Sequence, residues 1–131
     1  MKIMFWNIRG LVNHPSRLAL KRLFLLHKPD ILLIAEPLTH FQNLPPNWLQ
    51  RLGLKIFSFN ERLNLLPNLW CIFSIDISPN VIDIDDQQVT FSLSVNNISI
   101  FISAIYASTS NINRKNLWLK LNSLQNTYDV P

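Results

Sequence analysis

The sequence contains almost no cysteine and almost no glycine. Cys71 is the only cysteine among 131 residues, so no internal disulfide can form and a reducing compartment is expected. Because it lies within the apolar run at residues 69–73, we predict a packed core thiol and not a reactive one. The shortage of glycine leaves Asn and Asp to form the tight turns, since both tolerate positive φ.

The sequence also lacks a long apolar run. Nothing approaches the roughly 18 continuous apolar residues of a membrane span, and Asn7 and Arg9 interrupt the first apolar stretch too early for a signal-peptide core. No membrane partner is therefore expected. We expect an intracellular protein, nuclear or cytoplasmic, that is not secreted.

Strong charge of either sign is missing as well. Twelve basic residues stand against eight acidic ones, which gives a net charge of +4 and favours a polyanionic partner without identifying it. Nucleic acid is compatible with this balance. The hydrophobic content of 48% is enough to build a core in one small domain, residues 1–131, or in a piece of a larger one.

The apolar patterns predict an α/β fold that opens with strand, helix and strand. Pro15 suits the first turn of the helix, and Pro29 ends it. Asp85-Asp86 and Asn96-Asn97 are expected in hairpin turns. The predicted strands lie near residues 2–8, 30–37, 54–59, 69–75, 81–84, 88–95 and 98–106, and the helices near 15–28 and 112–125.

An acidic cluster at Asp83, Asp85 and Asp86 has two interpretations. Closely spaced oxygen ligands can bind Ca²⁺ or Mg²⁺, but the segment lacks the glycine and the distal glutamate of a calcium loop. A solvated hairpin turn is the better interpretation. The three histidines show no metal-ligand spacing, and the sequence contains no phosphate loop, dinucleotide fingerprint or nucleophile elbow.

Three polar side chains stand at the predicted ends of buried strands: Asn7, Glu36 and Tyr106. Each has an ordinary explanation, with Asn7 as a turn former, Glu36 as an exposed loop acid and Tyr106 at the edge of the core. Strand ends are also common places for active-site groups. Because Pro37 follows, Glu36 is expected to leave the sheet in an extended conformation.

The sequence segments around these three residues favour a functional interpretation. The chain resembles the endonuclease/exonuclease/phosphatase superfamily, in particular the endonuclease region of plant non-LTR (LINE-type) retrotransposons. The resemblance covers essentially the whole chain. It rests on the segment at residues 66–70 and on the stretches MKIMFWNIRGL, HKPDILLIAEP and SAIYASTSNINRKNLWLKL.

The resemblance implies a site for phosphodiester hydrolysis. Asn7 and Glu36 match positions that hold a divalent metal, Mg²⁺ with Mn²⁺ as the alternative, and Tyr106 matches a tyrosine whose hydroxyl bonds the scissile phosphate. DNA would be the partner of the complete domain. Arg114 and Lys115 follow closely, as DNA backbone contacts or as a solvated helix start.

The departures from the family pattern point to an incomplete nuclease. Its Gly-Asp-x-Asn and Ser-Asp-His motifs, which carry the acid that activates water and the histidine of the phosphate site, are both absent. Without a general base, activity is expected to be lost. The resemblance thus implies the N-terminal portion of the domain, truncated by sequence decay or by gene-model boundaries.

The fold expected from the resemblance is half of a four-layer α/β sandwich. It would contain a mixed, mainly antiparallel sheet with both helices packed on one face. The other face would be an exposed apolar surface prone to self-association.

Three functions compete at this point. The first is a truncated, retrotransposon-derived, Mg²⁺-dependent domain that in complete form nicks DNA. The second is a non-catalytic remnant that binds nucleic acid or a partner weakly. The third is a superfamily phosphatase or exonuclease that acts on other phosphate esters.

The coding DNA provides a test of truncation. We expect the nucleotides after codon 131, in some frame or across an intron, to encode a short apolar strand ending in Gly-Asp-x-Asn and, further on, Ser-Asp-His. Sequencing that shows intact motifs would make the chain half of an enzyme, and motifs eroded by stop codons would make it a dead fragment. Unrelated sequence would contradict truncation and favour the non-catalytic remnant.

Overall fold

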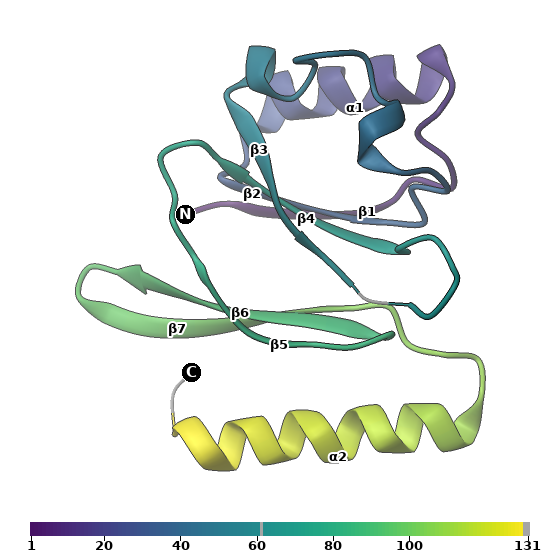
Figure 1. Cartoon of the computed structure of the whole chain (residues 1–131). Coiled ribbons are helices and arrows are strands. Elements are labelled where there is room, and N and C mark those ends of the chain that lie inside the picture. Colours follow the sequence, from purple (N-terminus) through teal and green to yellow (C-terminus); the bar gives the residue numbers. More distant parts are fainter. Residues whose placement is uncertain (61, 130–131) are drawn as a thin grey trace.

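Two β-sheets pack face to face between two helices in the computed structural model, which describes residues 1–60 and 62–129 (Figure 1). The predicted strands and helices are present, with ends that shift by only a few residues. The elements are β1 (Ile3–Asn7), α1 (His14–His27), β2 (Ile31–Ala35), η1 (Phe41–Asn43), η2 (Gln50–Leu52), β3 (Leu54–Phe59), β4 (Leu69–Ser74), β5 (Asn80–Ile84), β6 (Gln88–Val95), β7 (Ile98–Ile105) and α2 (Asn111–Tyr128).

The first sheet has four strands in the order β1-β2-β4-β3, and the second has three in the order β5-β6-β7. β1 runs parallel to β2 because α1 connects them as a crossover, and the other strand pairs are antiparallel. The structure therefore confirms the α/β class, the strand-helix-strand opening and the mixed, mainly antiparallel pairing.

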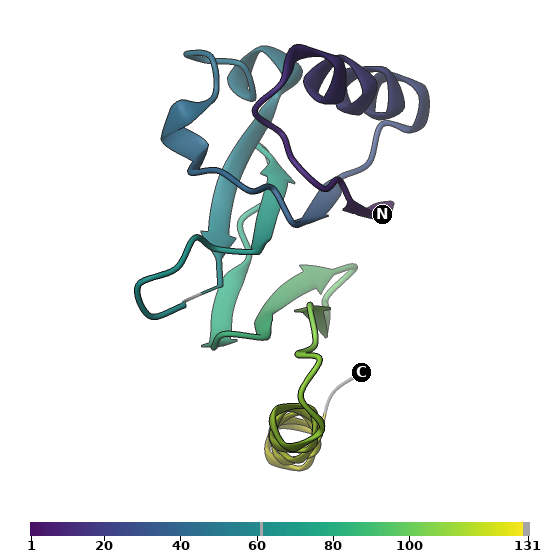
Figure 2. The ribbon, with the colours of Figure 1, turned by 90° about the vertical axis from the view of Figure 1, so that its right-hand side faces the viewer.

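The arrangement of layers differs from the expectation of one sheet with both helices on one face. α1 covers the outer face of the four-stranded sheet, and α2 covers the outer face of the three-stranded sheet (Figures 1 and 2). The two helices lie on opposite sides because β5–β7 form a separate sheet. The inner face of this second sheet packs on the four-stranded sheet, so α2 covers its outer face. The chain thus contains four layers by itself.

Alternate residues of the central strands fill two separate cores. On β2, Leu32 and Ile34 pack toward α1, whereas Ile31 and Leu33 pack toward the second sheet. All five residues of β2 are buried, as expected for a strand covered on both faces. Cys71 of β4 lies in the core between the sheets, where burial raises the pKa of its thiol to about 12, so the prediction of an inert core thiol is confirmed.

Local sequence signals fix the ends of α1 and one hairpin. The side chain of Asn13 accepts a hydrogen bond from the Ser16 N–H at 2.8 Å and caps the start of the helix. Asn96 and Asn97 both have positive φ, which is the conformation of a tight two-residue hairpin. Among the described residues, no helix has the length and apolar character needed to cross a membrane.

The second sheet covers most of the face that was expected to be exposed. At the edge strand β1, however, the side chains of Ile3 and Phe5 point toward the sheet-sheet layer and remain 45% and 50% exposed. An apolar surface thus remains exposed at the β1 edge. Self-association through it stays a prediction.

The aromatic cluster between the sheets gives a test of the core. The ring of Phe73 on β4 is fully buried and meets the rings of Phe57 and Phe91 edge to face, at centroid distances of 5.1 and 4.9 Å. We expect Phe73→Ala to lower the free energy of unfolding in urea by about 3–5 kcal/mol. Ile75→Ala, at a residue that is 54% exposed, is the control and should change it by less than about 0.5 kcal/mol. Equal effects would contradict this packing.

Candidate active site

Asn7 and Glu36 lie together because β1 and β2 are parallel neighbours. Asn7 is paired with Ala35 in the strand register, and Glu36 follows directly. The backbone N–H of Glu36 bonds to the carbonyl of Asn68 at 2.9 Å, and its carbonyl accepts from the N–H of Gly10 at 2.8 Å. The loop that leaves β1 and the loop that enters β4 are therefore both bonded to the Glu36 backbone.

The backbone of Glu36 is not extended, which corrects the expectation from Pro37. Its φ is +51°, in the left-handed region that residues with a side chain rarely adopt. The two backbone hydrogen bonds hold this conformation and turn the chain away from the strand direction. Such conformations cost on the order of 1–3 kcal/mol and are concentrated at functional sites.

Tyr106 reaches the same carboxylate from the other sheet. It follows β7, and its hydroxyl donates to Oε1 of Glu36. The side-chain amide of Asn7 donates to the same oxygen at 3.2 Å. The structure thus brings Asn7, Glu36 and Tyr106 together as expected, but between the ends of two sheets and not at the rim of one.

These hydrogen bonds shift the protonation of both acids. The Tyr106 hydroxyl, followed by the Asn7 amide and the nearby positive charge of Arg9, holds the pKa of Glu36 below its ordinary value. The Glu36 carboxylate in turn raises the pKa of Tyr106. At neutral pH the site therefore contains a carboxylate and a protonated phenol, which is an acceptor beside a donor.

Two asparagines support the loop beneath Glu36, and neither was expected from the sequence to be a site residue. The fully buried side chain of Asn60 accepts from the N–H groups of Asn68 and Leu69, both at 2.9 Å. Its amide donates to the side chain of Asn68 at 2.6 Å and to the carbonyl of Asp86 at 2.9 Å. Because Asp86 precedes β6, this side chain ties the two sheets together. An Asn at the end of an apolar strand was the only signal in the sequence.

Gln87 holds Tyr106 in a similar way. Its carbonyl accepts from the N–H of Tyr106, and its side-chain oxygen accepts from the N–H of Ser108, both at 2.8 Å. The side-chain amide donates to the carbonyl of Asn113 in α2 at 2.9 Å. Gln87 is buried and positions the segment between β7 and α2.

The basic residues after Tyr106 differ in role. The guanidinium of Arg114 donates to the carbonyls of Ser108 and Thr109, at 3.2 and 3.1 Å, and to the side chain of Asn111. It therefore stabilises the turn into α2. Lys115 is exposed on the first turns of the helix.

The acidic cluster forms an ion pair within the fold. The ammonium of Lys120 on α2 lies 2.8 Å from Asp83 and 2.9 Å from Asp85. One oxygen of Asp85 also accepts from the N–H of Gln87 at 2.8 Å. The hairpin interpretation fits, and a protein cation lies where the alternative placed a metal.

The oxygens of Glu36 and Asn7 suit a hard cation that keeps most of its water. Both protein donors use Oε1 of Glu36, and no hydrogen bond in the described part of the chain reaches Oε2 or the amide oxygen of Asn7. The described residues contain no group of three His, Cys, Asp or Glu side chains around a common point. The pair therefore fits Mg²⁺ or Mn²⁺ shared with a phosphate, and not a closed metal cage.

Comparison with known proteins identifies the fold. No protein-family model and no curated protein matches the sequence. The endonuclease domain of TRAS1, a telomere-specific non-LTR retrotransposon, superposes with a TM-score of 0.65 over 97% of this chain and 54% of its own, at 14% identity. The 3'-5' exonuclease NExo from Neisseria meningitidis gives a TM-score of 0.61 at 20% identity, over 94% of this chain and 50% of its own.

An AP endonuclease from Archaeoglobus fulgidus is also similar, with a TM-score of 0.57 at 18% identity over 92% of this chain and 48% of that protein. The chain thus spans about half the length of the structures that it resembles. All three have the fold of the endonuclease/exonuclease/phosphatase superfamily, and the chain shares that fold.

The hydrogen bond between Tyr106 and Glu36 can be tested by titration. Tyr106→Phe removes the main cause of the lowered pKa, so we expect the pKa of Glu36 to rise toward its ordinary value, measured by carbon-13 NMR of its carboxyl. Tyr128→Phe, at the other tyrosine, should leave it unchanged. A lowered pKa also means that the stabilisation is present above the unfolded-state pKa and is lost as the pH falls through the folded-state value. An unchanged Glu36 pKa in Tyr106→Phe would show that the contact does not exist in solution.

Proposed function

We propose, on the basis of this superfamily fold, that Asn7, Glu36 and Tyr106 form the metal-binding and phosphate-binding part of a DNA-nicking endonuclease site. The complete domain would hydrolyse a phosphodiester bond in DNA with Mg²⁺, or with Mn²⁺ in its place. The origin proposed for the domain is a non-LTR retrotransposon of plants.

The observation that carries the proposal is the meeting of three side chains, two of which bond to the carboxylate of the third. They come from two different sheets and are separated by 29 and 70 residues in the sequence, yet Asn7 and Tyr106 both donate to Oε1 of Glu36. The left-handed backbone of Glu36 adds a conformational cost that packing alone does not require. The net positive charge of the chain is suited to a polyanion such as DNA.

The side chains can act on a phosphate without changing their protonation at neutral pH. Glu36 is ionised and offers oxygen ligands, since its pKa is lowered. Tyr106 is protonated, since its pKa is raised by Glu36, and can donate its hydroxyl proton in a hydrogen bond to a phosphate oxygen. This donor would stabilise the negative charge that increases on the phosphoryl oxygens as the bond breaks.

A divalent metal would be held by Glu36 and the amide oxygen of Asn7. When bound, it supplies Lewis-acid polarisation of the phosphoryl oxygen and offsets charge on the leaving group. These two residues would bind and orient the metal, and the Asn7 amide is held by its hydrogen bond to Glu36.

Activation of the attacking water requires another group. The sequence contains neither Gly-Asp-x-Asn nor Ser-Asp-His, and no described residue adds an acid or histidine to the site. The isolated chain is therefore proposed to bind metal and DNA weakly and not to cleave DNA. We propose that it corresponds to the N-terminal portion of the domain.

The same lack of a base favours a second candidate, a non-catalytic domain that binds nucleic acid. Strong DNA binding that is unchanged in Glu36→Ala would support this candidate. A phosphatase or exonuclease remains the third candidate, because one similar structure is described as a 3'-5' exonuclease. Hydrolysis of a small phosphomonoester with no effect on plasmid DNA would support that one.

Metal binding tests the site directly. We expect Mn²⁺ to bind the isolated chain with fast-exchange broadening of the NMR signals of Asn7 and Glu36. In Glu36→Ala the affinity should fall by about tenfold or more, since the carboxylate is the main ligand. Asp76→Asn is the control: it removes one negative charge from an exposed turn remote from the site and should leave the Mn²⁺ affinity unchanged. An equal loss of Mn²⁺ affinity in both variants would show that the effect comes from net charge alone, and would contradict a metal site at Glu36.

Cleavage is the second test. We expect no nicking of supercoiled plasmid DNA by the purified chain in Mg²⁺, because the water-activating acid is absent. The measurement is the conversion of supercoiled to open-circular DNA on a gel. Nicking by the wild-type chain that Glu36→Ala abolishes would show that these residues suffice and would overturn the proposed incomplete site.

A further inference from the structure

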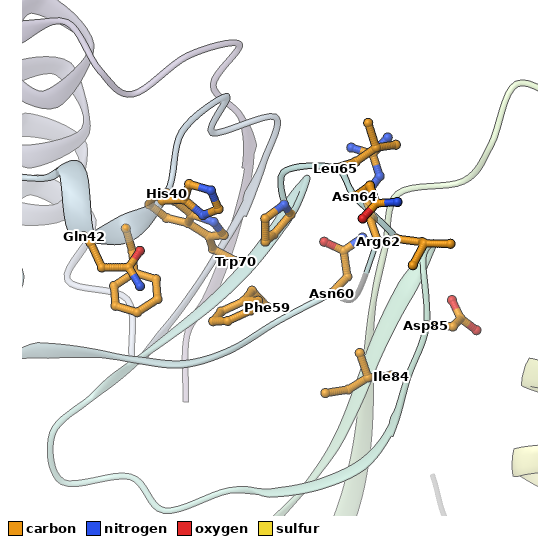
Figure 3. Close-up of a pocket in the computed structure, with 13 residues that line it drawn as sticks. His40, Gln42, Phe59, Asn60, Arg62, Asn64, Leu65, Trp70, Ile84 and Asp85 are labelled. Carbon is orange, nitrogen blue, oxygen red and sulfur yellow. The ribbon is translucent and has the colours of Figure 1, made fainter.

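A cavity of about 820 Å³ lies beside the candidate active site (Figure 3). Its walls come from the segment around η1, the end of β3, the loop that leads to β4, and the end of β5. In the view of Figure 3, His40 and Gln42 lie on one side of Phe59, and Arg62 and Leu65 lie on the other. The volume is within the range of about 300–1,000 Å³ that is typical of small-molecule sites.

The cavity offers an aromatic face to a ligand. Phe59 is 37% exposed, an unusual position for a phenylalanine at the end of a strand. Its ring lies 5.8 Å from the ring of Phe41, and the fully buried Trp70 supports the wall behind them. Leu65 and Ile84 add apolar surface. A flat ring could therefore stack on Phe59 without displacing the core.

The charge of the lining suits an anionic ligand. Asp85 lies 2.9 Å from Lys120, an ammonium that it shares with Asp83, and it accepts backbone N–H groups, so its negative charge is partly offset within the fold. Arg62 donates to the carbonyl of Leu66 at 2.9 Å, a neutral partner that leaves its positive charge in place. The polar groups of His40 and Gln42 are exposed at the mouth.

Hydrogen bonds connect the cavity to the candidate active site. Asn60 lines the cavity and bonds to Asn68, and the carbonyl of Asn68 accepts from the backbone of Glu36. The positive charge of Arg62, on the wall of the cavity, lowers the pKa of Tyr106 against the dominant raising effect of Glu36. The cavity is therefore joined to the candidate active site through Asn60 and Asn68.

We propose that this cavity binds an unpaired nucleobase of a DNA strand whose phosphate lies at the Asn7–Glu36–Tyr106 site. The inference rests on the proposed function. A base has two flat faces for Phe59, and its strand carries the negative charge that Arg62 attracts. An apolar peptide would make no polar contact with Arg62 or the exposed amides. A paired base cannot enter a concave site without leaving its stack.

Binding of two matched probes tests the inference. Fluorescence anisotropy would compare a short oligothymidylate with an oligomer of the same length in which every base is replaced by hydrogen on a tetrahydrofuran backbone. Phe59→Leu keeps the apolar volume and removes the aromatic face. We expect Phe59→Leu to lower the affinity for the oligothymidylate by about fivefold or more, since each stacked base contributes about 1–3 kcal/mol. The affinity for the baseless oligomer should stay unchanged. Trp118→Leu, at an aromatic residue on α2 that is 63% exposed, is the matched control and should change neither probe.

Each other outcome overturns the inference. Equal weakening of both probes would mean that Phe59 acts on the backbone or on the fold, and no weakening would mean that no base stacks there. Tighter binding of a blunt duplex than of the single strand would exclude an unpaired base. Mn²⁺ binding read in the same samples reports on Glu36 separately, so loss of the proposed metal site and loss of the base site can be told apart.

A second measurement does not depend on the variant folding. Oligomers that carry 5-bromouracil, irradiated with the wild-type chain, should cross-link to a peptide that contains residues 40–42 or 59–65, as identified by mass spectrometry. Cross-linking confined to α2, where Trp118 and Tyr128 are exposed aromatic residues, would overturn the inference.

Discussion

The hydrogen bond from the Tyr106 hydroxyl to the Glu36 carboxylate joins the ends of two sheets whose shared core is built from apolar side chains. It sets the protonation of both groups, since it lowers the pKa of Glu36 and raises that of Tyr106. It also requires that the two sheets keep a fixed separation and angle. The geometry of the candidate site therefore depends on the core packing between the two sheets.

Buried polar side chains supply that fixed geometry where apolar packing ends. Asn60 bonds to the start of β4 in one sheet and to the turn before β6 in the other. Gln87 connects the same turn to Tyr106 and to α2. Buried amides cost free energy unless all their partners are present, so each of them favours one arrangement of the loops. The carbonyl of Asn68, in a loop held in this way, and the N–H of Gly10 bond to the backbone of Glu36 in its left-handed conformation.

Much of the fold could be predicted from the sequence because its strands are short apolar runs bounded by Asn, Asp and Pro. The parallel pair β1 and β2 followed from the helix between them, and the hairpin at Asn96 followed from local φ preferences. The separation into two sheets could not be predicted, because a half-buried strand has the same pattern in either sheet. The supporting roles of Asn60 and Gln87 depend on contacts across 26 residues or between a strand end and a helix, which no local pattern encodes.

The candidate site was predicted in part for a similar reason. Asn7, Glu36 and Tyr106 stood out as polar residues at strand ends, and the structure brings them into contact. The prediction of an extended conformation for Glu36 was wrong. The hydrogen bond from its N–H to the carbonyl of Asn68 overrides the local preference of a residue before proline. The catalytic role of the three residues stays a prediction that the fold supports.

The central claim is that these three residues form a divalent-metal and phosphate site. The most direct measurement is a crystal structure of the chain soaked in Mn²⁺, with the metal located by its anomalous scattering. We expect a single strong peak within bonding distance of Oε2 of Glu36 and of the amide oxygen of Asn7. A peak at Asp83 and Asp85 with Lys120 displaced, or no peak at Glu36 at saturating Mn²⁺, would contradict it.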